Sequence, residues 1–176
     1  MPNRLAALLL PPVLAGGCAT APEPPAEAVR HAFVLEQDLV GRTIGRGRFS
    51  TITGVERTFT ARLNGTWDGT TLTLVEDFEF DDGVKERKTW RLARTAHGTY
   101  TGTREDVEGQ ARGFMDDGMF RLEYVMRPPG EDGRPGPRLR FRDVLAKLPD
   151  GRVVNHATVG WWGLRVGRVS LVITRE

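Results

Sequence analysis

The stretch from Thr66 to Leu92 limits the possible folds more than any other part of the chain. It has two arms on either side of an Asp81-Asp82-Gly83 turn, and in each arm every second residue belongs to one mostly apolar row. Alternation with a period of two, interrupted by a short turn that contains glycine, is typical of a β-hairpin. The two rows are Leu72, Leu74, Glu76, Phe78 and Phe80, followed by Glu86, Lys88, Trp90 and Leu92.

Two opposite charges, Glu76 and Lys88, lie in the middle of these mostly apolar rows. A charge that is buried without a partner is costly, so a face that only fills a dry core would not carry them. Residues that face each other across a hairpin are close enough to interact. The sequence therefore predicts that Glu76 and Lys88 form a pair inside the protein.

The rest of the folded region has the same β pattern. No proline occurs between Ala26 and Arg127, which suits continuous paired strands. Only His31–Val40 and Val144–Lys147 have helical character. Besides the two arms of the hairpin, we expect strands at Leu39–Thr53, Val55–Trp67, Gly98–Val107, Phe120–Met126, Leu139–Leu145, Val153–Val159 and Gly167–Arg175.

About nine strands without a strand–helix–strand rhythm predict an all-β fold, a single antiparallel β-barrel of the lipocalin or calycin type. A closed barrel leaves no raw sheet edge, whereas the alternative, a two-sheet sandwich, does. The inward rows of such a barrel would bring together polar and aromatic residues as an internal network or cavity lining. These candidates are Arg57, Glu76, Lys88, Trp90, Arg104, Asp106, Asp143 and Asn155. For any one of the charged residues, the alternative is a solvated face or a structural ion pair.

The N-terminus has the pattern of a bacterial lipoprotein signal. Arg4 precedes the apolar stretch Leu5–Leu14, and small residues then lead to Cys18, the single cysteine of the chain. Residues 14–18, with the sequence LAGGC, resemble a lipobox, which implies cleavage before Cys18 and acylation of this residue. The alternative is an ordinary secretory signal followed by a chance cysteine. Because the residue after the cysteine is not aspartate, the resemblance favours the periplasmic face of the outer membrane.

These features predict three parts of the chain. Residues 1–17 are a lipoprotein signal peptide, residues 18–29 are the lipidated cysteine with a proline-rich tether, and residues 30–176 are the barrel domain. Acyl chains on Cys18 would attach the protein to a membrane, since several chains on one residue hold more durably than one.

Other classes of function have little support. Lys and Arg number 25 against 23 acidic residues, with no long basic run, so we expect no nucleic-acid partner. The two serines of the expected domain, Ser50 and Ser170, lack a nucleophile motif. His31, His97 and His156 are scattered without ligand spacing. We therefore expect no metal site, no cofactor and no catalytic residue that can be named.

Several motifs together resemble the DUF3833 family of proteobacterial lipoproteins, a family of unknown function. The resemblance spans about Phe33 to the C-terminus and includes the lipobox, and it implies an envelope location without an established activity. It also implies that Glu76, Asp106 and Asn155 deserve testing. The motifs are Leu74-x-Glu76-x-Phe78-x-Phe80, Lys88-x-Trp90, Tyr100-x-Gly102, Asp106-Val107-x-Gly109-x-Ala111-x-Gly113, Asp143, Asn155 and Trp162-Gly163-x-x-Val166-Gly167.

Two main hypotheses for function follow. In the first, the barrel binds or carries a small amphiphilic or lipid-like molecule. Arg57, Lys88 and Arg104 would then face an acidic head group, and Trp67, Phe78, Trp90 and Tyr124 the apolar part. In the second, the barrel is filled and the protein acts through contacts of its outer surface with a protein partner, whose identity the sequence does not indicate. A third hypothesis, an enzyme with Glu76 and Asp106 as acid and base, requires separated pKa values.

Overall fold

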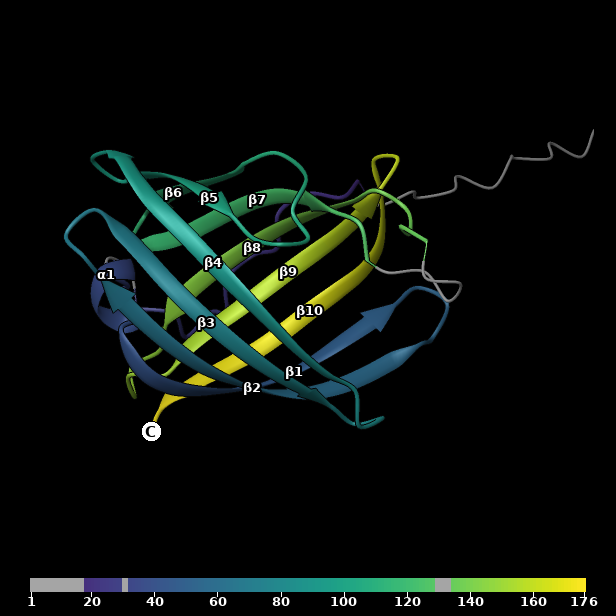
Figure 1. The fold of residues 1–176 in the computed structure, drawn as a ribbon, viewed down its shortest axis with the longest axis horizontal. Coiled ribbons are helices and arrows are strands. Elements are labelled where there is room, and N and C mark those ends of the chain that lie inside the picture. The colour runs from purple at the N-terminus through teal and green to yellow at the C-terminus, as the bar shows by residue number, and fades with distance from the viewer. Residues whose placement is uncertain (1–17, 30–31, 129–133) are drawn as a thin grey trace, which may run out of the picture.

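In the computed structural model, which describes residues 18–29, 32–128 and 134–176, ten antiparallel strands form a closed barrel in chain order. The first strand pairs with the last, from Thr43 opposite Arg175 to Thr51 opposite Gly167 (Figure 1). The strands are β1 (Gly41–Thr51), β2 (Glu56–Trp67), β3 (Thr71–Phe80), β4 (Lys85–Ala96), β5 (Thr99–Thr103), β6 (Ala111–Asp116), β7 (Met119–Met126), β8 (Leu139–Lys147), β9 (Val153–Trp161) and β10 (Leu164–Arg175).

The predicted all-β lipocalin-like barrel is confirmed, and the two-sheet sandwich is wrong because the strands form one closed ring. The hairpin of β3 and β4 has the expected register, with Glu76 directly opposite Lys88. Two expectations for local structure are corrected. Residues 111–116 form β6, which the strand assignment missed, and residues 144–147 are the end of β8 and not a helix. The apolar run in β8 looks helical because both of its faces are covered.

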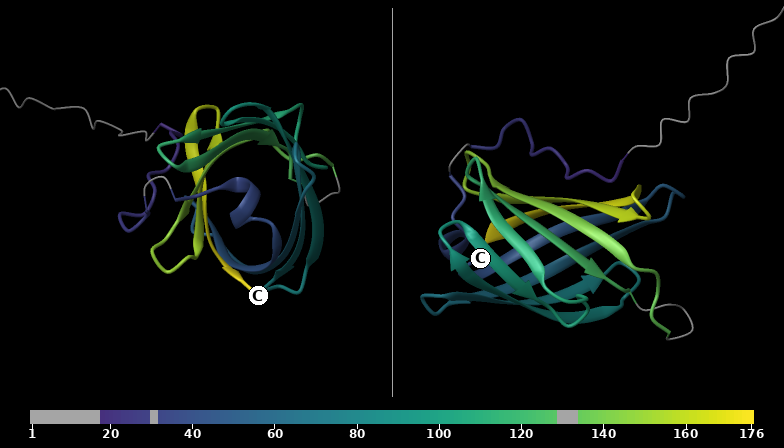
Figure 2. Two further views of the ribbon diagram at one scale, coloured as in Figure 1. Left: turned by 90° about the vertical axis from the view of Figure 1, so that its left-hand side faces the viewer. Right: turned by 90° about the horizontal axis from the view of Figure 1, so that it is seen from above.

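One end of the barrel is closed by the short helix α1 (Leu35–Asp38), which lies within the ring of strands (Figure 2). Within the predicted helical stretch 31–40, only these four residues are described as helical. Phe33, Leu35 and Leu39 are almost fully buried and belong to the main apolar core. No helix in the described ranges has the length and hydropathy needed to cross a membrane.

Polar contacts fix α1 to the surrounding strands. The Asp38 carboxylate accepts a 2.7 Å hydrogen bond from Lys147 Nζ, and Glu36 Oε1 accepts bonds from Tyr100 Oη at 2.6 Å and Arg94 Nη2 at 2.5 Å. Burial and the bond to Glu36 raise the pKa of Tyr100 to about 12. Burial alone would raise the pKa of Glu36, but its hydrogen bonds with Tyr100 and Arg94 hold this pKa below its ordinary value. The segment around α1 therefore plugs this end of the barrel, and ion pairs as well as apolar packing hold it in place.

The close approach of the plug to β2 depends on a glycine. A Cβ atom at Gly65 would lie 1.8 Å from the carbonyl oxygen of Leu39, which is backbone and cannot move aside cheaply. We expect Gly65→Ala to lower the free energy of unfolding by about 2 kcal/mol or more, because overpacking displaces the segment after α1. Urea denaturation measures the change, with the exposed neighbour variant Thr66→Ala as the control. Equal stability of the two variants would contradict this contact.

The mouth at the other end is bordered by the connections β1–β2, β3–β4, β5–β6, β7–β8 and β9–β10. In an antiparallel ring taken in chain order, alternate connections lie at the same end, so these five are opposite α1. Figure 1 shows the hairpins β1–β2, β3–β4 and β9–β10 projecting there. The mouth is the end through which the interior can be reached.

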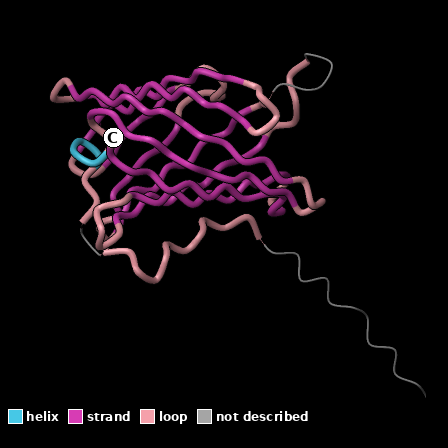
Figure 3. Tube along the Cα trace, turned by 90° about the horizontal axis from the view of Figure 1, so that it is seen from below, coloured by secondary structure: helices cyan, strands magenta, loops and turns pink. Residues whose placement is uncertain are grey.

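Segment 18–29, which composition predicts to be a tether, lies along the outer wall of the barrel (Figure 3). The amide of Ala19 donates to the carbonyl of Gly163 at 3.0 Å, and the amide of Val29 donates to that of Lys147 at 2.8 Å. Between these ends, Ala21 and Ala28 pack on an outer apolar cluster of Met119, Val144, Ala146 and Val154. The predicted signal peptide, residues 1–17, lies outside the described residues.

Candidate functional site

A group of charged and amide side chains lies inside the barrel, between the plug and the mouth. We name this group, Glu76, Lys88, Arg104, Asp106, Asp143 and Asn155, the interior polar cluster. Its members come from β3, β4, the connection after β5, β8 and β9, so closure of the ring is what brings them together. The carboxyl groups of Glu76 and Asp143 are the most deeply placed, with both residues less than a tenth exposed.

Arg104 is the centre of the cluster. Its Nε donates to Asp106 Oδ1 at 2.7 Å, and its Nη1 lies 3.7 Å from Glu76 Oε2. Lys88 Nζ lies 3.4 Å from Asp106 and 3.4 Å from Glu86. The expected ion pair between Glu76 and Lys88 is therefore corrected. The two residues are neighbours in register, but each has its charge partner on another residue, because Arg104 reaches across to Glu76.

Aromatic rings hold the guanidinium of Arg104 in place. Its Cζ atom lies 4.7 Å from the ring centroid of Trp90 and 5.5 Å from that of Tyr124, and these two rings meet edge to face at 5.1 Å. A planar guanidinium stacks on aromatic faces while its edges bind carboxylates, which a lysine could not do equally well. The side chain of Arg104 is accordingly only 10% exposed.

The second part of the cluster is the pair Asp143 and Asn155. Asn155 Nδ2 donates to Asp143 Oδ2 at 3.1 Å, across neighbouring strands β8 and β9. Three buried oxygens of the cluster lack a hydrogen-bond partner among the described residues: Glu76 Oε2, Asp143 Oδ1 and Asn155 Oδ1. Since buried polar atoms in proteins are almost always satisfied, these oxygens indicate where water or a ligand group binds.

Burial separates the acids into two kinds. It raises the pKa of Glu76 to about 7, despite Arg104, and it raises the pKa of Asp143 to about 7, despite the bond from Asn155. For Asp106, burial is outweighed by Arg104 and Lys88, which hold its pKa below the ordinary value. Near neutral pH the cluster thus contains a fixed Asp106 carboxylate and two acids that are close to their titration point. This separation of Glu76 from Asp106 is the pattern that acid–base chemistry requires.

Two of the predicted site residues, Arg57 and Trp90, are not members of the interior polar cluster. Arg57 lies at the mouth, where it binds Asp82 at 2.6 Å and stacks on Phe80 at 4.1 Å, so it is outside the cluster. Trp90 is buried beneath Arg104 as part of the core. Because Arg57, Lys88 and Arg104 already have carboxylate partners, the geometry does not favour the acidic head group considered from the sequence.

Sequence reasoning missed Glu86 and the second role of Tyr124. Glu86 belongs to the inward row of β4 and pairs with Lys88, so the period-two pattern could have identified it. Tyr124 was expected only as an apolar lining residue. The structure places it against Arg104, where burial raises the pKa of its hydroxyl well above the ordinary value.

Partly buried apolar side chains lie between the cluster and the mouth. Phe59 and Phe78 meet edge to face at 5.7 Å, and Phe78 stacks on Phe80 at 6.1 Å. On the opposite side of the barrel, Phe141 stacks on Tyr124 at 5.1 Å. The inner surface thus changes from apolar near the opening to polar in the middle, which is the order that an amphiphile entering with its polar end first would meet.

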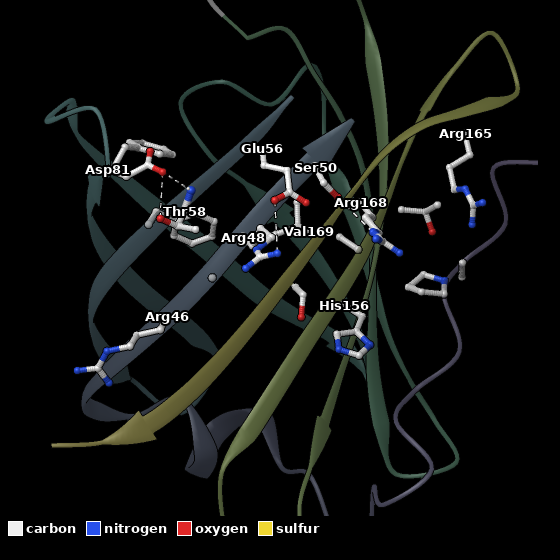
Figure 4. A pocket seen from close by; sticks show the side chains of 18 of the residues that line it. Arg46, Arg48, Ser50, Glu56, Thr58, Asp81, His156, Arg165, Arg168 and Val169 are labelled. Atoms are coloured by element: carbon white, nitrogen blue, oxygen red, sulfur yellow. Dashed lines mark hydrogen bonds and ion pairs between the residues drawn. The ribbon is translucent and has the colours of Figure 1, made fainter. Parts of the chain in front are cut away.

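Three hollows in the described part of the protein include none of the cluster residues; their volumes are about 1190, 860 and 280 Å³. The largest is drawn in Figure 4 and runs between the outer wall and segment 18–23. Its polar side chains come from the outward rows of β1, β9 and β10 and from β2 and the end of β3, with Phe59 and Phe80 at the mouth. These outward residues include Arg46, Arg48, Ser50, His156, Thr158, Arg168 and Ser170.

The described residues contain no group of three or more His, Cys, Asp and Glu side chains arranged to hold a metal ion. His156 lies on the outer side of the barrel wall, His97 is exposed in the turn between β4 and β5, and His31 lies outside the described residues. Cys18 is exposed and has no disulfide partner in the described chain.

Comparisons with known proteins agree with this fold. A family model described as "Protein of unknown function (DUF3833)" matches residues 13–175, and no curated protein matches the chain. The S-type phycobiliprotein lyase CPES from Guillardia theta is similar in structure, with a TM-score of 0.62 and 12% identity over 87% of this chain and 98% of the lyase. At this identity the likeness shows the fold alone.

Two structures solved with DFHBI bound are more distant. EF1p2_mFAP2b has a TM-score of 0.41 and 9% identity, over 80% of this chain and 95% of that one. The redesigned β-barrel mFAP1 has a TM-score of 0.38 and 12% identity, over 77% and 95%.

Proposed function

The chain belongs to the DUF3833 family of proteins of unknown function, and from this premise we propose that it is an envelope lipoprotein whose barrel binds a small amphiphilic molecule through the mouth. The observation that supports this proposal is a set of oxygens on Glu76, Asp143 and Asn155 that lack a hydrogen-bond partner among the described residues and are buried inside an aromatic-lined barrel. Burying such an oxygen without a hydrogen bond costs free energy. A ligand group or a water molecule that donates a hydrogen bond to it removes this cost.

The chemistry of the cluster limits the polar end of the ligand. All three atoms without a hydrogen bond are carboxyl or amide oxygens, and the nearby bases, Lys88 and Arg104, already pair with Asp106. The complementary group is therefore a hydrogen-bond donor, such as a hydroxyl, an amide N–H or an amine. The apolar part of the ligand would lie between Phe78 and Phe141 near the opening.

Anchoring is the second half of the proposal. Cys18 is exposed at the start of the described chain, where the lipobox-like residues place the acylation site. Acyl chains there would hold the barrel at the periplasmic face of the outer membrane. Globomycin treatment of the expressing cells tests this step, because it should leave an uncleaved precursor of higher mass, and an unchanged mass would contradict acylation.

Native mass spectrometry tests the binding proposal. The mature chain, residues 18–176 with Cys18→Ser, is exported behind an ordinary cleavable signal and purified from the periplasm without detergent. It is then extracted with organic solvent and compared with Asn155→Leu in the same background. We expect a stoichiometric amphiphile in the parent and its loss in Asn155→Leu, which removes the Oδ1 acceptor, together with the Nδ2 donor to Asp143, without changing formal charge. The matched control is Asn64→Leu on the exposed face of β2, which should keep the ligand.

A parent protein that shows only its own mass would count against the carrier proposal. The filled-barrel alternative, in which the protein acts through its outer surface, would then be supported, and cross-linking in the envelope would identify the partner. A ligand that persists equally in Asn155→Leu would mean that binding occurs away from the cluster.

A further inference from the structure

Large apolar side chains are exposed mainly at the mouth. Seven such residues are exposed in the described part of the chain, and six of them lie in or beside the hairpins β1–β2, β3–β4 and β9–β10. These six are Ile52, Val55, Val84, Trp161, Trp162 and Leu164. Their gathering at one end is not expected from chance scatter of surface apolar residues, and it indicates an interaction surface.

Trp162, at the tip of the β9–β10 hairpin, has a strained backbone conformation. Trp162 is 87% exposed and has φ of 50°, and Gly163 follows with φ of 81°. Positive φ at both residues of a two-residue hairpin turn favours Asn-Gly, and a bulky residue there is an outlier. Since Trp162 gains little packing from the rest of the protein, strain at this position points to a role in contact with something else.

The site of proposed acylation lies beside this hairpin. Cys18 pairs with Leu164 as an isolated β-bridge, and the next amide, Ala19, donates to the carbonyl of Gly163. The acyl chains would therefore emerge next to Trp162. This neighbourhood places the anchor and the exposed apolar residues at the same end of the barrel.

Arginines flank the hairpin on both sides. The hollow of about 860 Å³ beside Trp161 and Trp162 is lined by Arg127, Arg138, Arg140 and Arg142. Arg127 and Arg138 pair with Glu108, and Arg142 pairs with Glu123, which leaves Arg140 as the arginine of this hollow that faces no carboxylate among the described residues. On the other side, Arg165 and Arg168 line the groove of Figure 4, where Arg165 extends toward segment 18–23. Arg140 and Arg165 have no ion-pair partner among the residues that the structure describes.

We propose that the mouth end of the barrel is a docking surface for an anionic phospholipid bilayer. Trp161, Trp162 and Leu164 enter the interfacial region, where tryptophan is favoured. Arg140 and Arg165, the flanking arginines without a carboxylate partner among the described residues, bind lipid phosphates. The orientation builds on the anchoring proposed for Cys18, although the surface itself is formed by other residues. In this orientation the opening of the barrel faces the lipid, so an amphiphile passes between bilayer and barrel without crossing open water.

Vesicle sedimentation with the mature chain, residues 18–176 carrying Cys18→Ser, tests the surface without the acyl chains and without the apolar stretch Leu5–Leu14 of the signal. We expect binding to equimolar phosphatidylcholine and phosphatidylglycerol vesicles, with a blue shift of tryptophan fluorescence, and weaker binding to phosphatidylcholine alone. The combined variant Trp162→Asn and Leu164→Ser should have an affinity for the vesicles that is lower by a factor of about ten or more. Trp162→Asn relieves the strained turn, so its thermal midpoint should not fall and misfolding cannot explain the loss. Val29→Ser, which removes the exposed apolar residue outside these hairpins, is the matched control.

Charge is tested by Arg140→Gln with Arg165→Gln, which should weaken binding to the anionic vesicles, whereas Arg91→Gln on the outer face of β4 should not. Protein that stays in solution with both kinds of vesicle would overturn the proposal, and so would binding that is unchanged in the hairpin and arginine variants. These results are independent of ligand copurification, so failure of docking and failure of amphiphile binding are distinguished.

Discussion

Replacing Arg104 with methionine is expected to lower the free energy of unfolding by about 3–5 kcal/mol at pH 8, the cost typical of breaking a buried ion pair from one side. Methionine keeps much of the length of the side chain but removes the charge that faces Glu76 and Asp106. Asp106 retains Lys88 as a partner, while Glu76 retains no ion-pair partner within the described residues. Urea denaturation at pH 8, where Glu76 is mostly ionised, measures the full effect.

Two comparisons make this result specific. Arg91→Met alters an exposed arginine on β4 and should change stability by less than about 0.5 kcal/mol. Adding Glu76→Gln to Arg104→Met should restore part of the loss, because the uncompensated buried charge is then absent. If Arg104→Met is as stable as Arg91→Met, the interior polar cluster is solvated and Arg104 is not its centre.

The second large effect is on the pH dependence of stability. Glu76 and Asp143 have pKa values of about 7 in the folded protein, against ordinary values of 4.5 and 3.8. Between these limits the folded protein binds more protons than the unfolded chain, so stability falls as pH rises from about 4 to 7 and is level above that. The free energy of unfolding therefore rises as pH falls from 8 to 5. Each group that is protonated in the folded protein and ionised in the unfolded chain contributes about 1.4 kcal/mol per pH unit.

Because the charges of Glu76 and Asp143 act on each other, the two groups titrate as a coupled pair, and we expect a total gain of about 3–5 kcal/mol between pH 8 and pH 5. Below about pH 4 the trend reverses, since carboxyl groups with lowered pKa values, such as Asp106, then lose their ion pairs. Thermal or urea unfolding at several pH values measures the curve.

Matched variants identify the groups responsible. Glu76→Gln together with Asp143→Asn should flatten the curve between pH 5 and 8 and raise stability at pH 8, because neither side chain can then ionise. Asp77→Asn, on the outward face of β3, should leave the slope in place. A parent protein that becomes less stable on going from pH 8 to pH 5 would contradict the burial of these acids.

The fold could be predicted because alternation with a period of two is a local property of the sequence. The hairpin with Glu76 opposite Lys88 follows directly from its rows and its turn. The strand formed by residues 111–116 escaped notice because it is short and carries Gly113, whose lack of a side chain makes room for the ring of Phe120. Residues 144–147, at the end of β8, have an apolar run with helical character because segment 18–29 covers the outer face of this strand, which composition alone does not reveal.

The sequence predicts which polar residues point into the barrel, but it does not predict which of their charges form ion pairs. Inward rows identify which polar residues enter the barrel, and most of the predicted residues do lie there. Which charge meets which depends on the tilt of the strands and on the length of the side chains. Arg104 extends from the connection after β5 to Glu76 on β3 across the intervening β4, and no pattern within either segment indicates that distance.

Closure of the ring by β1 and β10 also has a consequence for how the chain folds. These two strands are separated by more than a hundred residues, and neither has its full set of neighbours until the last strand is available. Pairings of such high sequence separation form slowly, since most of the chain must be ordered before they contribute. Until then both strands are open edges that can pair with other chains. Removing β10 would therefore turn a closed barrel into an aggregating chain, although every other hairpin is still encoded.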